Sequence, residues 1–196
     1  LELLAQLPDD AGKIKEMYGL KSYLQGLTGG LEFKRRAIFE PTCTICGLTS
    51  GYQGPGSKTV LPAVASAKVD FRLALGQTIE AVLEGLRRHL DAGGFQDVEI
   101  NFLGGGPAAK TDPDDPFIQL VSTTATEIYG MPMDLVPMIG GSGPNHAFIH
   151  HLDLPVATAG VGHPGSGAHA PNENVRLDLY LKGARHITRI LKAFGA

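Results

Sequence analysis

Alternation of apolar and polar residues predicts three strands in the first half of the chain. In 67–73, Ala, Val, Phe and Leu alternate with Lys, Asp and Arg, and 98–102 repeats the pattern with Val, Ile and Phe. This period of two indicates strands with one buried face, and it places Arg72 on the polar face of its strand. A third strand is predicted for 42–48, which is rich in β-branched residues.

Other segments have apolar residues at helical spacing. The chain to about Leu24 is predicted to be helical, and a second helix is expected to begin at Thr78 and end at Gly93. The apolar stripe of that second helix consists of Ile79, Val82, Leu83, Leu86 and Leu90. Residues 37–103 therefore form a predicted ββαβ unit, a small α+β arrangement that lacks an opening element.

A linker rich in Gly, Pro and Asp spans 104–116, and it places a domain boundary near Lys110. Beyond it, three helices are predicted to alternate with two apolar strands, which is typical of a parallel sheet covered by helices. The predicted helices are 115–129, 144–152 and 178–194, and the predicted strands are 133–138 and 154–161. The fold class is thus α/β, with domains at 1–110 and 111–196.

Composition narrows the function classes. The chain has 196 residues, 43% of them hydrophobic and 19% charged, with a net charge of −3. An acidic balance argues against a nucleic-acid partner. There is neither an apolar run long enough to cross a membrane nor a signal-peptide pattern at the start, so a cytoplasmic protein is expected.

The two cysteines, Cys43 and Cys46, form a single CxxC motif. Such a motif is found in redox pairs and in half zinc sites. Here it lies in a predicted strand, where residues three apart point to opposite faces. We therefore interpret the cysteines as two small strand residues.

Both predicted strands of the second domain run into glycine-rich loops, at 139–146 and 160–169. Ligands of open α/β sheets gather where strands end, so these loops are the candidate site. Gly140-Gly141-Ser142-Gly143-Pro144 suits either an anion or carbonyl cradle or a tight turn capped by Ser142.

Five of the seven histidines fall into two groups by position. His146, His163 and His169 lie in or beside the glycine-rich loops, and their spacing leaves functional and structural roles open. His89 and His186 fall within amphipathic helices and are predicted to be surface residues. Neither HExxH nor GxSxG is present. A hydrolase site built from this chain alone would therefore be incomplete.

Three motifs in order, GSKTVLPAVASAKVDFRL, VPMIGGSGPNHAF and LPVATAGVGHPGSGAHAPNEN, resemble the second half of a zinc exopeptidase. The family contains carnosine-type dipeptidases, acetylornithine deacetylases, aminoacylases and glutamate carboxypeptidases, and the dipeptidase branch is the most similar. The resemblance implies a partial ferredoxin-like α+β lid and dimerisation domain at 1–110, without its first elements. Residues 111–196 would be the C-terminal part of the α/β zinc-exopeptidase catalytic domain.

The resemblance also implies roles for individual residues. His169 matches the last metal ligand, and Gly141, Ser142 and Gly143 match a loop that holds the carboxylate end of the substrate. Arg72 matches a lid arginine that pairs with that carboxylate, and Thr59 matches a lid residue that reaches the partner subunit's active site. The family's other metal ligands and its general base have no counterpart in this sequence, so no residue is assigned as catalytic. Asn172 and Glu173 look like groups that fix the loop.

The function implied is hydrolysis of the amide bond of a dipeptide or N-acyl amino acid by water activated between two zinc ions. The chain would be a fragment that carries the substrate-anchoring and dimerising parts of a homodimer and is inactive alone. A metal-free dimerisation or binding module is the alternative. A phosphate-binding role for the GGSGP loop is disfavoured, because neither Lys nor Arg lies beside it.

Overall fold

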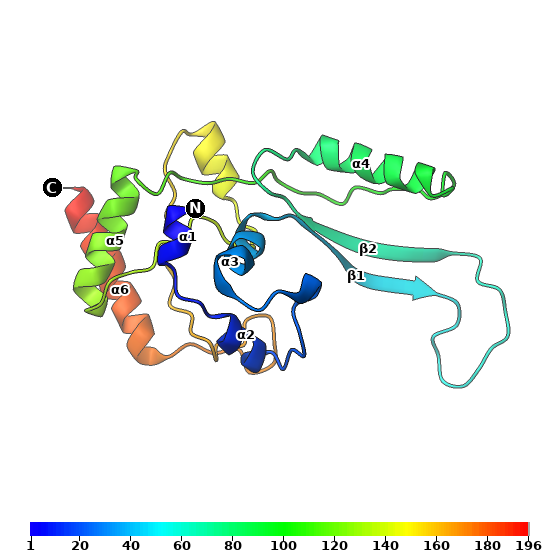
Figure 1. Cartoon of the computed structure of the whole chain (residues 1–196), viewed down its shortest axis with the longest axis horizontal. Coiled ribbons are helices and arrows are strands. Elements are labelled where there is room, and N and C mark those ends of the chain that lie inside the picture. Colours follow the sequence, from blue (N-terminus) through cyan, green and yellow to red (C-terminus); the bar gives the residue numbers. More distant parts are fainter. Residues whose placement is uncertain (196) are drawn as a thin grey trace. The chain divides into compact units, whose positions relative to one another are not determined.

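The computed structural model describes residues 1–195, which form two compact units. Unit 1 combines Leu1–Lys34 with the chain from Ala109 onwards, and unit 2 is Arg35–Ala108. Figure 1 shows the elements along the chain, and together they make a mixed α/β protein with a two-stranded sheet. The division after Ala108 lies beside the expected boundary at Lys110, while residues 1–34 group with the later segment. The assignment of 1–110 to a lid stays a prediction.

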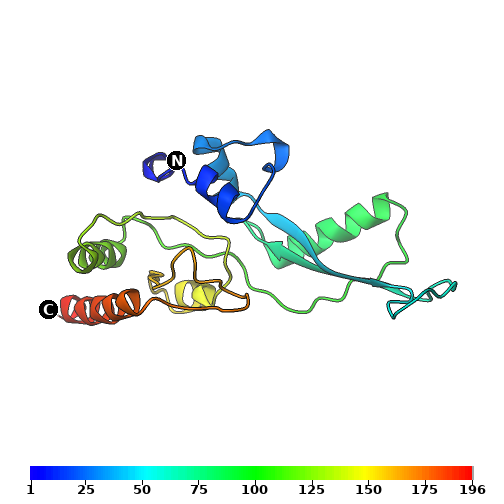
Figure 2. The same cartoon turned by 90° about the horizontal axis from the view of Figure 1, so that it is seen from below.

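Unit 2 contains a long antiparallel hairpin and one helix (Figure 2). Strand β1 (Thr42–Ser50) pairs with β2 (Ala65–Arg72) along their whole length, as the alternating pattern predicts. A β-bulge lies between Ile45 and Gly47, so Cys46 has no cross-strand partner. Both cysteines are exposed and free, in line with the interpretation as strand residues.

Helix α4 (Ile79–Ala92) follows the hairpin and is capped as predicted, because the Thr78 hydroxyl accepts a hydrogen bond from the Ala81 amide at 3.1 Å. The predicted strand at 98–102 is wrong, because it has no sheet partner in the described chain. The guanidinium of Arg87 instead holds the start of this segment, donating to the carbonyls of Phe95 at 2.7 Å and Val98 at 2.6 Å.

In unit 1 two predicted helices are confirmed and lie side by side (Figures 1 and 2): α5 (Pro116–Tyr129) and α6 (Leu177–Phe194). Asp115 caps α5 by accepting from the Phe117 amide at 2.8 Å. The prediction that His186 is a surface residue is wrong, since its exposed fraction is 3%. Its Nε2 lies 3.2 Å from the Thr124 hydroxyl and 3.1 Å from the Val121 carbonyl, so it joins the two helices.

The N-terminal stretch is helical, as its pattern predicts, but it is divided into several short helices. It forms α1 (Glu2–Gln6), α2 (Ala11–Met17), a 3-10 turn η1 (Leu24–Gly26) and α3 (Gly30–Phe39). Asp9 separates the first helices and accepts a hydrogen bond from the Gly30 amide at 2.7 Å. The ammonium of Lys34 donates to the carbonyls of Leu4 and Leu7 at the end of α1. These bonds fold residues 1–34 into a small helical cluster.

The predicted strands at 133–138 and 154–161 are also wrong, because within the described residues neither pairs with another strand. The predicted helix at 144–152 is observed at 145–151, where residues 145–146 are α-helical and the rest is the π-helix η2 (Ala147–His151). Unit 1 therefore has its helices and its connecting segments, but it has no sheet in the part of the chain described.

Few apolar side chains are buried. The accessible surface is 14568 Å², whereas a monomeric protein of this mass exposes about 8,900 Å². Among the described residues the buried hydrophobic ones are Leu4, Ala11, Val121 and Ala125. Much apolar surface that a core would normally cover is therefore open to solvent.

Within residues 1–195, every helix is too short or too polar to span a membrane.

Candidate functional site

The loop 163–174, which carries His169, is fixed by its own side chains. The Ser166 hydroxyl accepts from the His163 amide at 2.9 Å, and the Asn174 amide group donates to the carbonyls of Gly165 at 2.9 Å and Asn172 at 3.1 Å. The backbone closes the same loop, because the Asn174 N–H donates to the Ser166 carbonyl at 2.9 Å. The loop is therefore ordered by local bonds rather than by a sheet.

The imidazole of His163 bridges two parts of this loop. Its Nδ1 accepts from the Gly165 amide at 3.0 Å, and its Nε2 lies 3.0 Å from Oδ1 of Asn174. A backbone N–H can only donate, so Nδ1 is the acceptor of the Gly165 bond. His163 is thus a structural residue whose two ring nitrogens both bind within the loop.

His169 has an unusual backbone conformation. Its φ is 61° and that of Asn172 is 64°, so two non-glycine residues of this loop lie in the left-handed region. Such residues carry a cost that the surrounding structure must offset, and they concentrate at functional sites. The side chain of His169 is exposed, as a residue that receives a ligand must be.

Removing the imidazole of His163 should release the loop. In His163→Ala the Gly165 and Asn174 bonds are lost, so we expect faster amide exchange across 163–174, while α5 and α6 keep their protection. Hydrogen exchange read by mass spectrometry measures both. His89→Ala, at an exposed position of α4, is the control. Unchanged exchange in the loop would show that His163 does not order it.

The glycine-rich loop 140–143 is exposed throughout. A Cβ at Gly140 would meet no atom within 4 Å, and at Gly141 and Gly143 the nearest atoms lie at 3.5 Å and 3.6 Å. None of the three glycines has a positive φ. The fold itself therefore does not require glycine here, which leaves the space around the loop open to a ligand.

The other predicted site residues belong to unit 2. Arg72 ends β2, and its Nε lies 2.8 Å from Oδ1 of Asp70, two residues earlier on the same face of the strand. Thr59 is exposed in the connection between β1 and β2. The glycine loop and His169 lie in unit 1.

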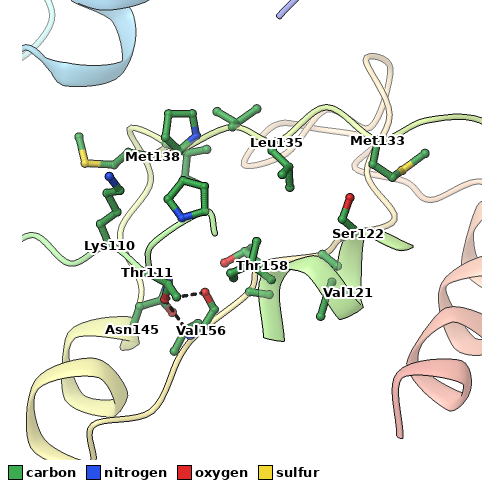
Figure 3. Close-up of a pocket in the computed structure, with 18 of the residues that line it drawn as sticks. Lys110, Thr111, Val121, Ser122, Met133, Leu135, Met138, Asn145, Val156 and Thr158 are labelled. Carbon is green, nitrogen blue, oxygen red and sulfur yellow. Dashed lines mark hydrogen bonds between the residues drawn. The ribbon is translucent and has the colours of Figure 1, made fainter. Parts of the chain in front are cut away.

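Unit 1 contains a cavity of about 520 Å³ (Figure 3). The cavity is lined by residues 109–111, by α5, and by the segments 133–139 and 156–160. Gly141 is among the lining residues, whereas Ser142, Gly143 and His169 are not. At its edge the Thr111 hydroxyl accepts from the Val156 amide at 2.8 Å and donates to the Val156 carbonyl at 3.0 Å.

Three histidines that follow the glycine loop in the sequence have neighbouring rings. The ring of His146 lies 4.8 Å from that of His150 and 5.2 Å from that of His151. Burial lowers the pKa of His146, and the positive charges of His150 and His151 lower it further. The folded chain therefore binds this proton less tightly than the unfolded chain, and the contribution of His146 to stability is lost as the pH falls.

A metal centre is not complete within the described residues, where no group of three or more His, Cys, Asp or Glu side chains could hold an ion. A zinc site needs at least three protein ligands. The residues present therefore do not fit a zinc ion by themselves.

The sequence is matched by the model of Peptidase family M20/M25/M40 over residues 9–193. This chain belongs to that family. The Cys-Gly metallodipeptidase dug1 of Schizosaccharomyces pombe is 25% identical over 150 residues, which are 74% of this chain and 32% of that protein. The family membership supports a peptidase function, and it confirms the resemblance drawn from the motifs.

Solved structures support the same family assignment. An M20 family metallo-carboxypeptidase from Sulfolobus solfataricus is 32% identical with a TM-score of 0.87, and the match covers 97% of this chain and 44% of that one. The di-peptidase Dug1p from Saccharomyces cerevisiae has the same fold, with 21% identity, a TM-score of 0.83, and 97% and 40% coverage. The chain thus spans less than half the length of the M20 relatives it matches.

Sequence reasoning missed two groups of the site. One is Asn174, whose side chain ties the His169 loop and which follows Asn172 and Glu173, the residues to which the resemblance gives this role. The second is Thr111, which binds both backbone groups of Val156. The Asn in a turn-rich segment was a usable signal, because Asn side chains bond nearby backbone. No feature of the linker sequence distinguishes Thr111 as a residue that binds the backbone of Val156.

Proposed function

We propose that this chain supplies the substrate-anchoring residues and one metal-ligating loop of a metal-dependent peptidase that hydrolyses dipeptides or N-acyl amino acids. The observation that carries the proposal is the left-handed, hydrogen-bonded loop that presents His169 in a chain matched by the M20 family along almost its whole length. Two relatives are named as dipeptidases and one as a carboxypeptidase, which favours a substrate with a free α-carboxylate.

His169 would donate an imidazole ligand to one of two zinc ions, the metal we expect for an imidazole donor in a hydrolase. The remaining ligands would come from outside this chain, since its described residues contain no group of three ligands. The isolated chain is accordingly expected to be inactive. This chain's own contribution is to order the loop that carries His169 through the bonds of His163 and Asn174.

Arg72 would anchor the carboxylate of the substrate. A guanidinium binds a carboxylate through two parallel hydrogen bonds, and Asp70 fixes the Nε side of the group at 2.8 Å. In unit 1, the amides and hydroxyl of Gly141, Ser142 and Gly143 are a separate candidate for binding a substrate carboxylate. Thr59 would reach the site of a partner subunit in a homodimer formed through the lid at 1–110.

Arg72→Ala is expected to raise KM for dipeptides by about 10- to 150-fold in the enzyme that contains this chain, because a charged hydrogen bond contributes about 1.5–3 kcal/mol. Arg72→Lys keeps the charge but loses the planar fork, so it should recover only part of the affinity. Steady-state kinetics on a dipeptide and on its C-terminal amide measure this. Equal losses on both substrates would contradict a carboxylate-anchoring role.

Zinc analysis and hydrolysis assays on the isolated chain test the proposal as a whole. We expect less than stoichiometric zinc and no turnover of dipeptides. Stoichiometric zinc with turnover would show that the chain holds a complete site. A stable dimer by light scattering that stays inactive when the rest of an M20 enzyme is supplied would favour a dimerisation module instead.

A cytoplasmic location is expected for a peptidase of this kind.

A further inference from the structure

The π-helical turn η2 brings three imidazoles together. With the two α-helical residues before it, Asn145 and His146, it forms the yellow helical segment of Figure 1. In an α-helix, with about 3.6 residues per turn, the residue four positions on lies over a given residue. The wider π turn, with its i→i+5 bonds, brings the fifth residue there as well. His146 is therefore a neighbour of both His150 and His151, at ring distances of 4.8 Å and 5.2 Å.

The positive charge that this cluster can take up has no counter-charge. The charges that act on His146 are those of His150 and His151, and within residues 1–195 no carboxylate is among them. Both of these histidines are exposed, so water reaches their rings. The titratable residues that face this part of the chain from the other cavity-lining segments, or that follow η2 directly, are Lys110, Tyr129, Asp134, His186 and Asp153. None of these five residues acts on the pKa of His146.

Backbone bonds close both ends of the turn. The Ala147 N–H donates to the Pro144 carbonyl at 3.0 Å, and the Leu154 N–H donates to the Phe148 carbonyl at 3.0 Å. Pro144 directly follows Gly143, so the first of these bonds also fixes the end of the glycine-rich loop. A short, exposed turn of this kind opens at a lower free energy than a packed helix.

Protonation acts against the closed turn. Burial lowers the pKa of His146, and the charges of His150 and His151 lower it further. The unfolded chain therefore binds the proton more tightly than the folded chain does. The stability contributed by the neutral imidazole is complete above about pH 6.5, the ordinary pKa of histidine, and is lost as the pH falls below it.

We infer that His146, His150 and His151 form an acid-sensitive latch on the glycine-rich loop 140–143. While the imidazoles are neutral, the turn is closed and the Ala147 N–H holds the Pro144 carbonyl. When two or more imidazoles carry a proton, their repulsion opens the turn and releases the end of the loop. The latch is a property of the chain itself and goes beyond the proposed function, which assigns no role to these histidines.

The test follows the chain by NMR, without metal or substrate. Amide exchange rates divided by the rates of an unstructured peptide at the same pH give the protection of each residue. From about pH 7.5 to about pH 5.5 we expect protection across 147–154 to fall by at least about 10-fold, while α5 and α6 keep theirs. The Cε1 proton of His146 should titrate at a lower pH than histidine in the urea-unfolded chain, because its pKa is lowered.

A double variant, His150→Gln with His151→Gln, separates repulsion from other effects of acid. Glutamine keeps a polar side chain but takes up no proton in this range. We expect the variant to match the original chain at about pH 7.5 and to change its protection across 147–154 by less than about twofold at pH 5.5. The pKa of His146 should rise in the same variant, since two of its causes are removed. His89→Gln, at an exposed position of α4, is the control and should keep the full pH dependence.

Salt provides a test that needs no substitution. At about 1 M ionic strength the screening length is about 3 Å, which is shorter than the distances between the three rings. Added sodium chloride should therefore restore most of the protection that is lost at pH 5.5.

Each result has a consequence. A turn that is unprotected at pH 7.5, protection that does not change with pH, or a loss that persists in the double variant or in high salt would each overturn the inference. Loss of protection in α5 and α6 together with the turn would mean general unfolding by acid, and would overturn it as well. These measurements involve neither zinc nor hydrolysis, so failure of the latch leaves the proposed function standing, and a zinc-free or inactive enzyme leaves the latch standing.

Discussion

Gly183→Ala is expected to destabilise unit 1 by about 1–3 kcal/mol, the range for overpacking a filled contact. Gly183 lies in α6 and is buried, and a Cβ built there would overlap Cγ1 of Val161. The next atoms, Cβ of Val161 at 3.8 Å and the Tyr129 hydroxyl oxygen at 4.0 Å, are at ordinary contact distance, so only Cγ1 of Val161 must give way. Either α6 moves away from the segment that ends at Val161, or the valine leaves its preferred rotamer.

The matched control is Gly85→Ala in the middle of α4. There the nearest atom to a new Cβ is Nη2 of Arg88 at 3.9 Å, so the methyl group has room. Alanine in an open helical position stabilises by about 0.5–1 kcal/mol. Urea unfolding followed by circular dichroism should therefore give opposite signs for the two variants. Equal effects would mean that Gly183 is not a packing contact.

The elements that could be predicted are those whose partners are close in sequence. The hairpin of β1 and β2 is specified by its alternation, and α4 and α5 by the caps Thr78 and Asp115. The helical character of residues 1–24 was predicted, but the packing of these short helices was not, because it depends on bonds from Asp9 to Gly30 and from Lys34 to Leu4, which are distant in sequence. Local signals do not report such a bond.

The predicted strands at 98–102, 133–138 and 154–161 failed for a different reason. Apolar alternation records that a face is buried, whereas a strand also needs backbone partners. In the described chain those partners are absent, and single groups such as the Arg87 guanidinium or the Thr111 hydroxyl bind the backbone instead. The pattern therefore predicts an apolar face, but it does not predict a backbone partner.

His186 shows where periodicity is ambiguous. It lies on the border of the apolar stripe of α6, where a polar residue can face water or a neighbouring helix. The Thr124 hydroxyl and the Val121 carbonyl on α5 provide partners, and these make burial possible. Which helix packs there cannot be read from α6 alone.

The candidate site was predictable only in part. Glycine at two strand ends marks the loops, but spacing did not separate His146, His163 and His169. The structure distinguishes them, since His163 bonds within its loop, His146 stacks with other histidines, and His169 alone of the three has a left-handed backbone. These differences depend on loop geometry, which the sequence pattern does not predict.

His169→Ala is expected to remove metal and rate together in the enzyme that contains this chain. Loss of a group that merely orients a ligand costs about 10–100-fold in metal affinity or activity, so loss of a ligand should exceed that range. The chain itself should stay folded, because His169 is exposed and the loop is held by His163, Ser166 and Asn174. Elemental analysis and dipeptide hydrolysis on the same sample measure both losses.

Two variants make this test specific. His151→Ala removes another exposed histidine of unit 1 and should leave metal content and rate unchanged. His163→Ala loosens the loop without removing the ligand, so it should weaken zinc binding less than His169→Ala does, and added zinc should restore part of its rate. If His169→Ala kept full zinc occupancy, His169 would not be a metal ligand, whatever the effect on rate. A ligand role predicts that zinc content and rate fall together.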